Sequence, residues 1–131
     1  MILDTSAIIA ILFREPTATG LLECLRQSPV RGVGTPTLVE AGVVLSARAG
    51  EPAVAWLHRF LQEFEVSVIP FEAGHWQEAV TAYNQFGRGR HPAALNLGDC
   101  FSYATARLAN QALLCIGDEF PKTDLAIVRL A

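Results

Sequence analysis

The chain has 131 residues, a net charge of −3, 51% hydrophobic residues and 18% charged residues. This composition is typical of a single compact domain over residues 1–131 and excludes a disordered chain. No apolar run approaches the roughly 20 residues that a membrane span needs, and the acidic balance gives no overall attraction to nucleic acid. A polyanionic partner would therefore have to be held by a local basic patch or through a metal ion.

The first segment, residues 1–3, lacks the basic region of a signal peptide and is predicted as a strand. The cysteines (Cys24, Cys100 and Cys115) are scattered and form no C-x-x-C pair. An odd, unpatterned set argues against a disulfide framework and for the reducing cytoplasm.

Short apolar runs then alternate with amphipathic stretches along the chain. The runs that predict strands are 1–3, 32–35, 66–69, 113–116 and 127–130. The patterns that predict helices lie at about 5–13, 16–28, 36–49, 52–63, 72–86 and 98–111. Strands separated by helices need crossover connections, so we expect an α/β fold with helices on both faces of a mostly parallel sheet of about five strands. Binding residues should follow the strands directly.

A carboxylate follows the first predicted strand at once. Asp4 stands between two apolar runs, beside Thr5 and Ser6. A charge left in a core costs several kcal/mol unless it is paired. Either Asp4 and the two hydroxyls cap the next helix, or Asp4 faces a site that needs a charge.

Glu40 is the second notable acid, one turn into the helix at 36–49. Its neighbours at i+3, i+4 and i+7 are Val43, Val44 and Ala47. This spacing places a carboxylate on an apolar stripe, where glutamate is rare unless it is paired.

Two further acids lie near predicted strand or helix ends. Asp99 opens the helix at 98–111, and Asp118 follows the strand at 113–116. Taken singly, Asp99 is explained equally well as an N-cap and Asp118 as a turn residue. If both converge with Asp4 and Glu40, the like charges repel one another unless a cation intervenes.

An all-carboxylate site is suited to Mg²⁺ or Mn²⁺. Such an ion contacts phosphate and activates water, so the pattern favours metal-dependent hydrolysis of phosphate esters. Thr5 or Ser6 would orient a metal-bound water or a phosphate oxygen. A zinc site is disfavoured, because His58, His75 and His91 lack ligand spacing and have no cysteine nearby.

The loop before Asp99 is basic. In the segment FGRGRHP, Arg88, Arg90 and His91 surround two glycines. The loop is no P-loop, since it lacks the closing Gly-Lys-Ser/Thr. It is either a solvated connection or a phosphate contact, and its position next to Asp99 favours the second role.

Four segments occur in an order typical of one family: MILDTSAIIAIL, TPTLVEA, YNQFGRGRHPAALNLGDCFSYATA and LLCIGDEFPKTDL. On these segments the sequence resembles the PIN-domain ribonucleases and, within them, the VapC toxins of type II toxin–antitoxin pairs. The resemblance implies a three-layer α/β/α fold and an Mg²⁺- or Mn²⁺-dependent endoribonuclease acting on RNA. It also implies a homodimer, held inactive by a VapB-type antitoxin in a heterotetramer or larger complex.

The resemblance extends to the site residues. The positions that match the family's acids are Asp4, Glu40 and Asp99, with Asp4 and Asp99 as direct metal ligands. The fourth acid falls in GDEFPKTD, where the family usually has Gly, Asn or Asp, and then Asp before Phe. We take Asp118 as this acid, with Glu119 and Asp124 as rivals.

Two other functions remain as alternatives. An aspartyl-nucleophile phosphatase commonly carries D-x-D, whereas position 6 here is serine. A catalytically silent module that only docks RNA or a partner has no need of clustered carboxylates. For an antitoxin helix we expect either a groove or core and dimer contacts at Leu21, Leu22, Leu25, Trp56 and Phe60. An antitoxin arginine would enter the acidic site.

Overall fold

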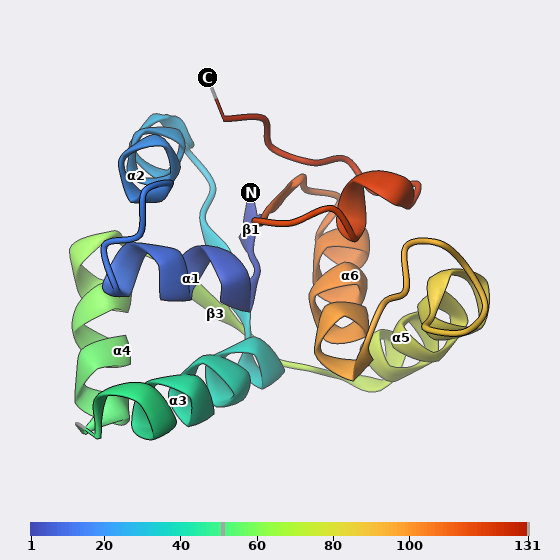
Figure 1. Ribbon diagram of the computed structural model, residues 1–131, viewed down its shortest axis with the longest axis horizontal. Coiled ribbons are helices and arrows are strands. Elements are labelled where there is room, and N and C mark those ends of the chain that lie inside the picture. Colours follow the sequence, from blue (N-terminus) through green and yellow to red (C-terminus); the bar gives the residue numbers. More distant parts are fainter. Residues whose placement is uncertain (51, 131) are drawn as a thin grey trace.

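Helices cover both faces of a parallel sheet in the computed structural model, which describes residues 1–50 and 52–130 (Figure 1). The strands are β1 (Ile2–Leu3), β2 (Gly32–Gly34), β3 (Ser67–Ile69) and β4 (Leu113–Leu114). The helices are α1 (Thr5–Leu12), α2 (Ala18–Gln27), α3 (Thr35–Ala49), α4 (Ala53–Glu63), α5 (Ala73–Phe86) and α6 (Leu97–Ala109), followed by a 3-10 turn (Phe120–Lys122). The predicted helices are confirmed, with ends that differ by about two residues at most.

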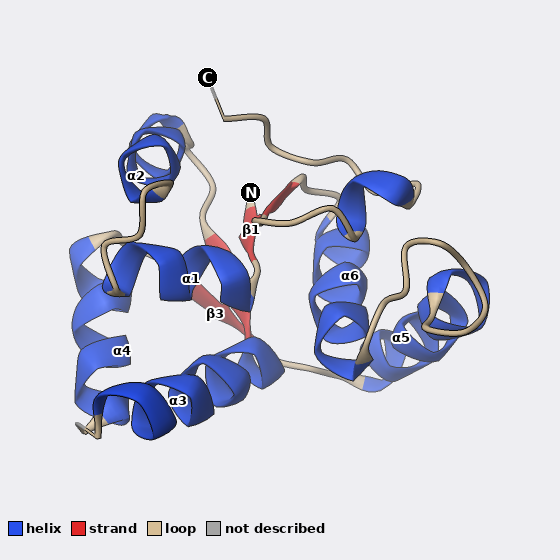
Figure 2. Cartoon of the chain, in the orientation of Figure 1, coloured by secondary structure: helices blue, strands red, loops and turns tan. Residues whose placement is uncertain are grey.

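The sheet order is β3-β2-β1-β4, and all three strand pairs are parallel. The chain moves outward from β1 to β3 and then returns to place β4 on the other side of β1. Figure 2 shows the strands between the two groups of helices. Because the strand order reverses between β1 and β4, the crevice at their carboxyl ends is the expected binding position.

Two hydrophobic cores lie on opposite faces of the sheet. Leu3 and Leu114 pack with α1 to α4, whereas Ile2 and Leu113 pack with α5 and α6. Alternate strand residues point to opposite faces, so each two-residue strand contributes to both cores. This arrangement confirms the three-layer α/β/α fold.

The predicted fifth strand is wrong. Residues 127–130 make only one bridge to the sheet, between Leu113 and Ile127, and Val128 N donates to Leu113 O. Beyond this point the segment leaves β4, and Leu130 packs over Gly20 of α2. Because Leu130 is partly buried against the core formed with α1 to α4, the backbone of this segment does not pair further with β4. The sheet therefore has four strands.

Two end signals explain why α3 begins and ends where it does. Pro36 lies in its first turn, where a missing N–H costs no helical bond. Gly50 follows its last residue with φ of 63°, the left-handed conformation that favours glycine. No helix in the described part of the chain is long and apolar enough to cross a membrane.

Candidate functional site

Asp4 ends β1 and is only 5% exposed. Its Oδ2 accepts from Ser6 N at 3.1 Å and from Ser6 Oγ at 2.6 Å, so Asp4 is the N-cap of α1. Its Oδ1 accepts from Ser102 Oγ at 2.5 Å. Ser6 Oγ in turn accepts from Ile116 N at 2.9 Å, which ties Asp4 to the segment that leaves β4. Asp4 is thus both a helix cap and a buried acid.

Glu40 reaches the same end of the sheet from the second turn of α3. Thr5 Oγ1 donates to Glu40 Oε1. The other side of the Glu40 carboxylate lies against Gly98 in the first turn of α6, where an added Cβ would collide with it. The absence of a side chain at Gly98 therefore leaves room for the Glu40 carboxylate.

The apolar stripe predicted around Glu40 is wrong in one respect. Val43 is 63% exposed and Ala47 is also exposed, whereas the core-facing residues of α3 are Thr37, Ala41 and Leu45. The valine at 43 faces outward because α4 leaves that side of α3 uncovered. Glu40 is therefore partly buried by its neighbours at the sheet edge and not by a helical stripe.

Asp99 is the third residue of α6, and Asn96 is the N-cap. Asp99 N donates to Asn96 Oδ1 at 2.8 Å, and Asn96 N donates to Asp99 Oδ2 at 3.1 Å. Partial burial, followed by the charges of Asp4, Glu119 and Glu40, raises the pKa of Asp99 to about 6. Asp99 therefore shares one electrostatic environment with the acids from the other segments.

Three acidic residues compete for the fourth position, and they differ in their surroundings. Glu119 acts on the pKa of Asp99 and also on that of Cys115, which burial and three carboxylates raise to about 12. Asp118 is exposed. Asp124 instead pairs with Arg107 at 2.6 Å. We call Asp4, Glu40, Asp99 and Glu119 the acidic cluster.

The acidic cluster has the donor chemistry of a hard-metal site. Within residues 1–50 and 52–130 the ion pairs are Arg48–Glu15 and Arg107–Asp124, so none of the four carboxylates is neutralised by a cation. No three potential ligands among these residues converge enough to enclose an ion unaided. Mg²⁺ usually takes only one or two carboxylates and keeps several waters, so the cluster fits such an ion.

The loop between α5 and α6 is ordered around a bridge between Gly87 and Leu95. Arg88 and Arg90 are exposed. Neither forms an ion pair with any described residue. His91 Nδ1 accepts from the backbone N of Ala93 at 3.0 Å, so one nitrogen of this histidine serves the loop itself.

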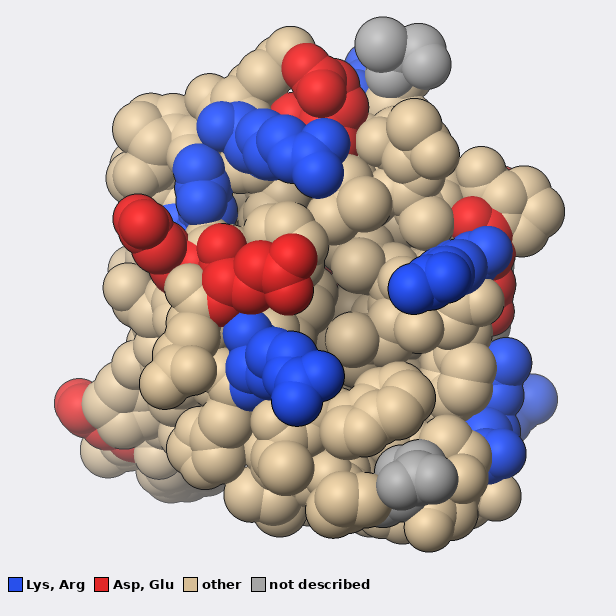
Figure 3. Space-filling view, turned by 90° about the vertical axis from the view of Figure 1, so that its left-hand side faces the viewer, with Lys and Arg blue, Asp and Glu red and all other residues tan. Residues whose placement is uncertain are grey.

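The residues expected to form either a groove or core contacts divide between the two. Leu21, Leu25 and Phe60 are at most 2% exposed and belong to the core. Trp56 and Leu22 edge a groove of about 570 Å³ between α4 and the α1–α2 segment. Lys/Arg and Asp/Glu side chains are interspersed on the face shown in Figure 3, so it has no single charge sign.

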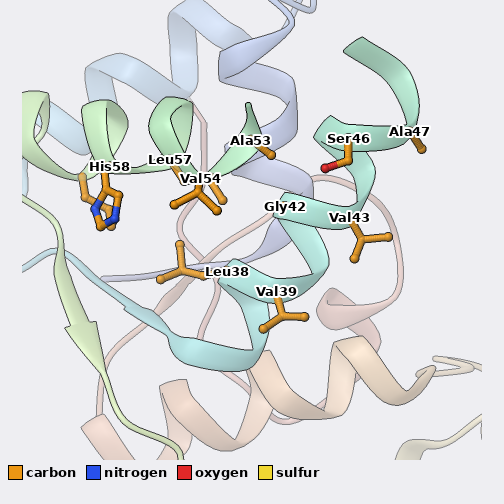
Figure 4. A pocket seen from close by; sticks show the side chains of 11 residues that line it. Leu38, Val39, Gly42, Val43, Ser46, Ala47, Ala53, Val54, Leu57 and His58 are labelled. Carbon is orange, nitrogen blue, oxygen red and sulfur yellow. The ribbon is translucent and has the colours of Figure 1, made fainter. Parts of the chain in front are cut away.

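A second groove, of about 700 Å³, lies between α3 and α4, within the region 36–63 where a groove was expected from the sequence, but none of the residues named for that groove lines it. Leu38 of α3 and Val54 of α4 point into the space between the two helices (Figure 4), and Val39 also lines the groove. Val39 and Val54 are 67% and 70% exposed. Exposed apolar side chains gathered in this way mark a contact surface.

A family model described as "PIN domain" matches residues 1–125. The chain belongs to the PIN-domain family. It is 41% identical over 128 residues to "Ribonuclease VapC" of Mycolicibacterium smegmatis, covering 98% of this chain and 99% of that one.

The fold of this PIN domain is also that of solved VapC structures. The sarcin-ricin loop cleaving toxin VapC20 of Mycobacterium tuberculosis superposes with a TM-score of 0.79 at 18% identity, over 98% of both chains. VapBC2 of Rickettsia felis, bound to a DNA fragment from its promoter, has a TM-score of 0.76 at 18% identity, over 98% of this chain and 96% of that one.

Two buried hydroxyls of this PIN domain were assigned no role from the sequence, although both lie in segments that carry the family resemblance. Thr37 and Ser102 lie within hydrogen-bond distance of each other behind Asp4. Their spacing is a further signal in the sequence. Thr37 precedes Glu40 by three residues and Ser102 follows Asp99 by three, so each shares a helix face with an acid.

Proposed function

We propose that the protein is a VapC-type toxin, a metal-dependent endoribonuclease that hydrolyses RNA phosphodiester bonds. The observation that carries this proposal is the acidic cluster at the carboxyl ends of β1 and β4, where no described cation neutralises it. Full-length similarity to a protein named Ribonuclease VapC supports the same activity.

In this proposal Asp4 and Asp99 hold Mg²⁺ or Mn²⁺. When bound, the ion lowers the pKa of a water and stabilises the charge that develops at phosphate. Glu40 accepts a proton from the attacking water at the carboxylate oxygen next to Gly98, because its Oε1 is already bonded to Thr5. We assign the fourth acidic position to Glu119 in place of Asp118, since Glu119 acts on Asp99.

We propose a role for Thr5 and Ser6 other than the expected contact with a phosphate oxygen. Each hydroxyl donates its single proton to a carboxylate, Thr5 to Glu40 and Ser6 to Asp4. A hydroxyl has only one proton to donate, so neither is free to donate to a phosphate oxygen. We therefore assign both to holding the acids in place.

We propose that Arg88 and Arg90 contact the RNA backbone. Both are exposed and have no ion-pair partner within the described chain, and their loop leads directly into α6. Arginine binds phosphate through two parallel hydrogen bonds, which suits such a contact. His91 has only Nε2 left for a phosphate.

The partners we propose are a VapB-type antitoxin and a second copy of the chain. An apolar helix of the antitoxin would fill the groove between α3 and α4, and an arginine would neutralise the acidic cluster. Trp76, Val80 and Leu97, all more than half exposed on α5 and α6, would form the contact between copies. A toxin–antitoxin complex from Klebsiella pneumoniae contains a chain of the same fold, which supports an antitoxin partner.

The proposal is tested with Asp4→Asn. Asparagine caps a helix as well as aspartate does, so α1 should persist while the charge is lost. We expect Mg²⁺-dependent cleavage of RNA to fall at least about 100-fold, because an ion ligand acts in the transition state. Expression of the Asp4→Asn variant should then no longer arrest growth.

The matched control is Asp124→Asn, which removes a carboxylate outside the acidic cluster. It should leave cleavage unchanged, although it breaks the ion pair with Arg107. Full activity of folded Asp4→Asn would contradict the proposal. So would RNA binding that is equal with and without EDTA and is never followed by cleavage, which is the behaviour of a silent binding module.

A further inference from the structure

The buried hydroxyls of Thr37 and Ser102 lie directly behind the acidic cluster. Thr37 is 2% exposed and Ser102 is fully buried. Thr37 Oγ1 lies 3.3 Å from Ser102 Oγ, and Ser102 Oγ lies 2.5 Å from Asp4 Oδ1. None of the roles proposed above uses either hydroxyl.

The number of protons sets the direction of this chain of hydrogen bonds. An ionised carboxylate only accepts, and a serine hydroxyl has one proton to give. Ser102 gives that proton to Asp4, so Thr37 is the donor in its contact with Ser102. The bonds therefore run from Thr37 to Ser102 to Asp4. In a buried position each bond polarises the next, which strengthens the one that ends on Asp4.

The same two hydroxyls connect the helices that carry the other acids. Thr37 lies three residues before Glu40 on α3, and Ser102 lies three residues after Asp99 on α6. The first turns of these helices approach each other below the sheet in Figure 1. A hydrogen bond between the hydroxyls therefore fixes the separation of α3 and α6 one turn behind Glu40 and Asp99.

We propose that Ser102 is a positioning residue for Asp4 and that Thr37 acts through Ser102. Ser6 holds one oxygen of the Asp4 carboxylate and Ser102 holds the other, so the carboxylate cannot rotate. The inference rests on the proposed function, because it takes Asp4 as a metal ligand. Hydrogen bonds to ligating carboxylates orient them toward the ion.

The test measures the affinity of the RNA-free protein for Mn²⁺ alone by isothermal titration calorimetry. Ser102→Ala should weaken binding on the order of 10- to 100-fold, the usual effect of losing a partner of a metal ligand. Thr37→Val, which keeps the volume but not the hydroxyl, should weaken it less, and Thr37→Ser should restore it. The double variant should bind no more weakly than Ser102→Ala.

Thr105→Val is the matched control. Thr105 is a buried hydroxyl one turn further along α6, and it donates to the backbone O of Phe101 instead of an acid. Its loss should leave the affinity for Mn²⁺ unchanged. Wild-type affinity in folded Ser102→Ala would overturn the proposal. If Thr37→Val weakened Mn²⁺ binding equally in the wild type and in Ser102→Ala, Thr37 would not act through Ser102, and that part of the proposal would be overturned.

A metal-free crystal structure of Ser102→Ala gives a second measurement. We expect the Asp4 carboxylate to rotate away from its wild-type place, and an unchanged orientation would overturn the proposal. If Ser102→Ala does not fold, the comparison of Thr37→Val with Thr37→Ser decides instead. Failure of the wild-type protein to bind Mn²⁺ would contradict the proposed function, whereas the Asp4 orientation would still decide the positioning role.

Discussion

At the scale of single residues, the acidic cluster stores charge repulsion that a cation would relieve. At Asp99, partial burial and then the charges of Asp4, Glu119 and Glu40 raise the pKa from 3.8 to about 6. Its carboxylate also completes the capping box of α6, so the residue cannot move away from the other acids without loosening its own helix. Repulsion and capping therefore act against each other at one side chain.

The raised pKa of Asp99 predicts how the stability of the metal-free protein depends on pH. Between about pH 4 and pH 6 the folded protein holds a proton that the unfolded chain has lost. The contribution of Asp99 to the free energy of unfolding therefore falls as pH rises through that window. Because solvent screens a partly exposed carboxylate, the fall should be well below the roughly 3 kcal/mol that the full pKa shift would give. Urea denaturation in EDTA at pH 4.5 and pH 7.5 measures it.

Asp99→Asn isolates that effect from the other titrating groups. The variant should lose the part of the pH slope that Asp99 contributes, and Mg²⁺ should stabilise the wild type at pH 7.5 more than the variant. Identical slopes in the two proteins would show that Asp99 does not titrate in this range.

Gly98 makes a second prediction at this scale. A methyl group at Gly98 would meet the Glu40 carboxylate, a flexible group that can move aside without disturbing the backbone. Gly98→Ala should therefore keep the fold and reduce RNA cleavage on the order of 10- to 100-fold, since small misplacements of a reacting group are costly. Cleavage rates and melting curves measure the two effects.

Gly42→Ala is the control, because its added methyl would only touch Leu57 at an ordinary 3.6 Å. That variant should cleave RNA normally and be more stable by up to about 1 kcal/mol, as alanine replaces glycine within a helix. Equal cleavage rates in the two variants would contradict the role given to Gly98.

At the scale of elements, the helices were predictable and the sheet was less so. Caps, prolines and amphipathic spacing act over a few residues, and α3 shows the first two in Gly50 and Pro36. The strands are only two or three residues long. For residues 127–130, backbone pairing with β4 competes with side-chain packing against α2. No local sequence pattern reveals which of the two is preferred.

The N-cap of α6 gives a prediction for one element. Asn96→Ala removes the acceptor for Asp99 N and should lower the unfolding free energy by about 1 kcal/mol. Asn96→Ser keeps an N-cap acceptor and should stay close to the wild type. Urea denaturation of the three proteins measures the difference, and equal losses in both variants would contradict the capping role.

At the scale of the whole molecule, the proposed function also involves a surface outside the acidic cluster. The groove between α3 and α4 is apolar, and Val54 is 70% exposed at its edge. Exposed side chains contribute little to the stability of the fold, so the monomer should tolerate a charged residue at position 54. The same charge would oppose the burial of an apolar partner helix.

Val54→Asp should therefore weaken neutralisation by the antitoxin at least about tenfold while leaving RNA cleavage intact. The matched control is Val30→Asp, an exposed valine outside the groove. Titration of nuclease activity with purified antitoxin measures the shift. Unchanged neutralisation of Val54→Asp would exclude this groove as the antitoxin site.

The sequence by itself determined the order of strands and helices and the placement of Asp4 and Asp99 near element ends. These features follow from interactions between residues close in the chain, such as the cap that Asp4 forms with Ser6. Only the tertiary structure decided that the charge of Glu119 acts on Asp99, that Val43 is exposed beside Glu40, and that Ser102 binds Asp4. The last contact joins residues 98 positions apart. Such contacts exist only after crossovers bring the strands side by side, and local spacing therefore does not encode them.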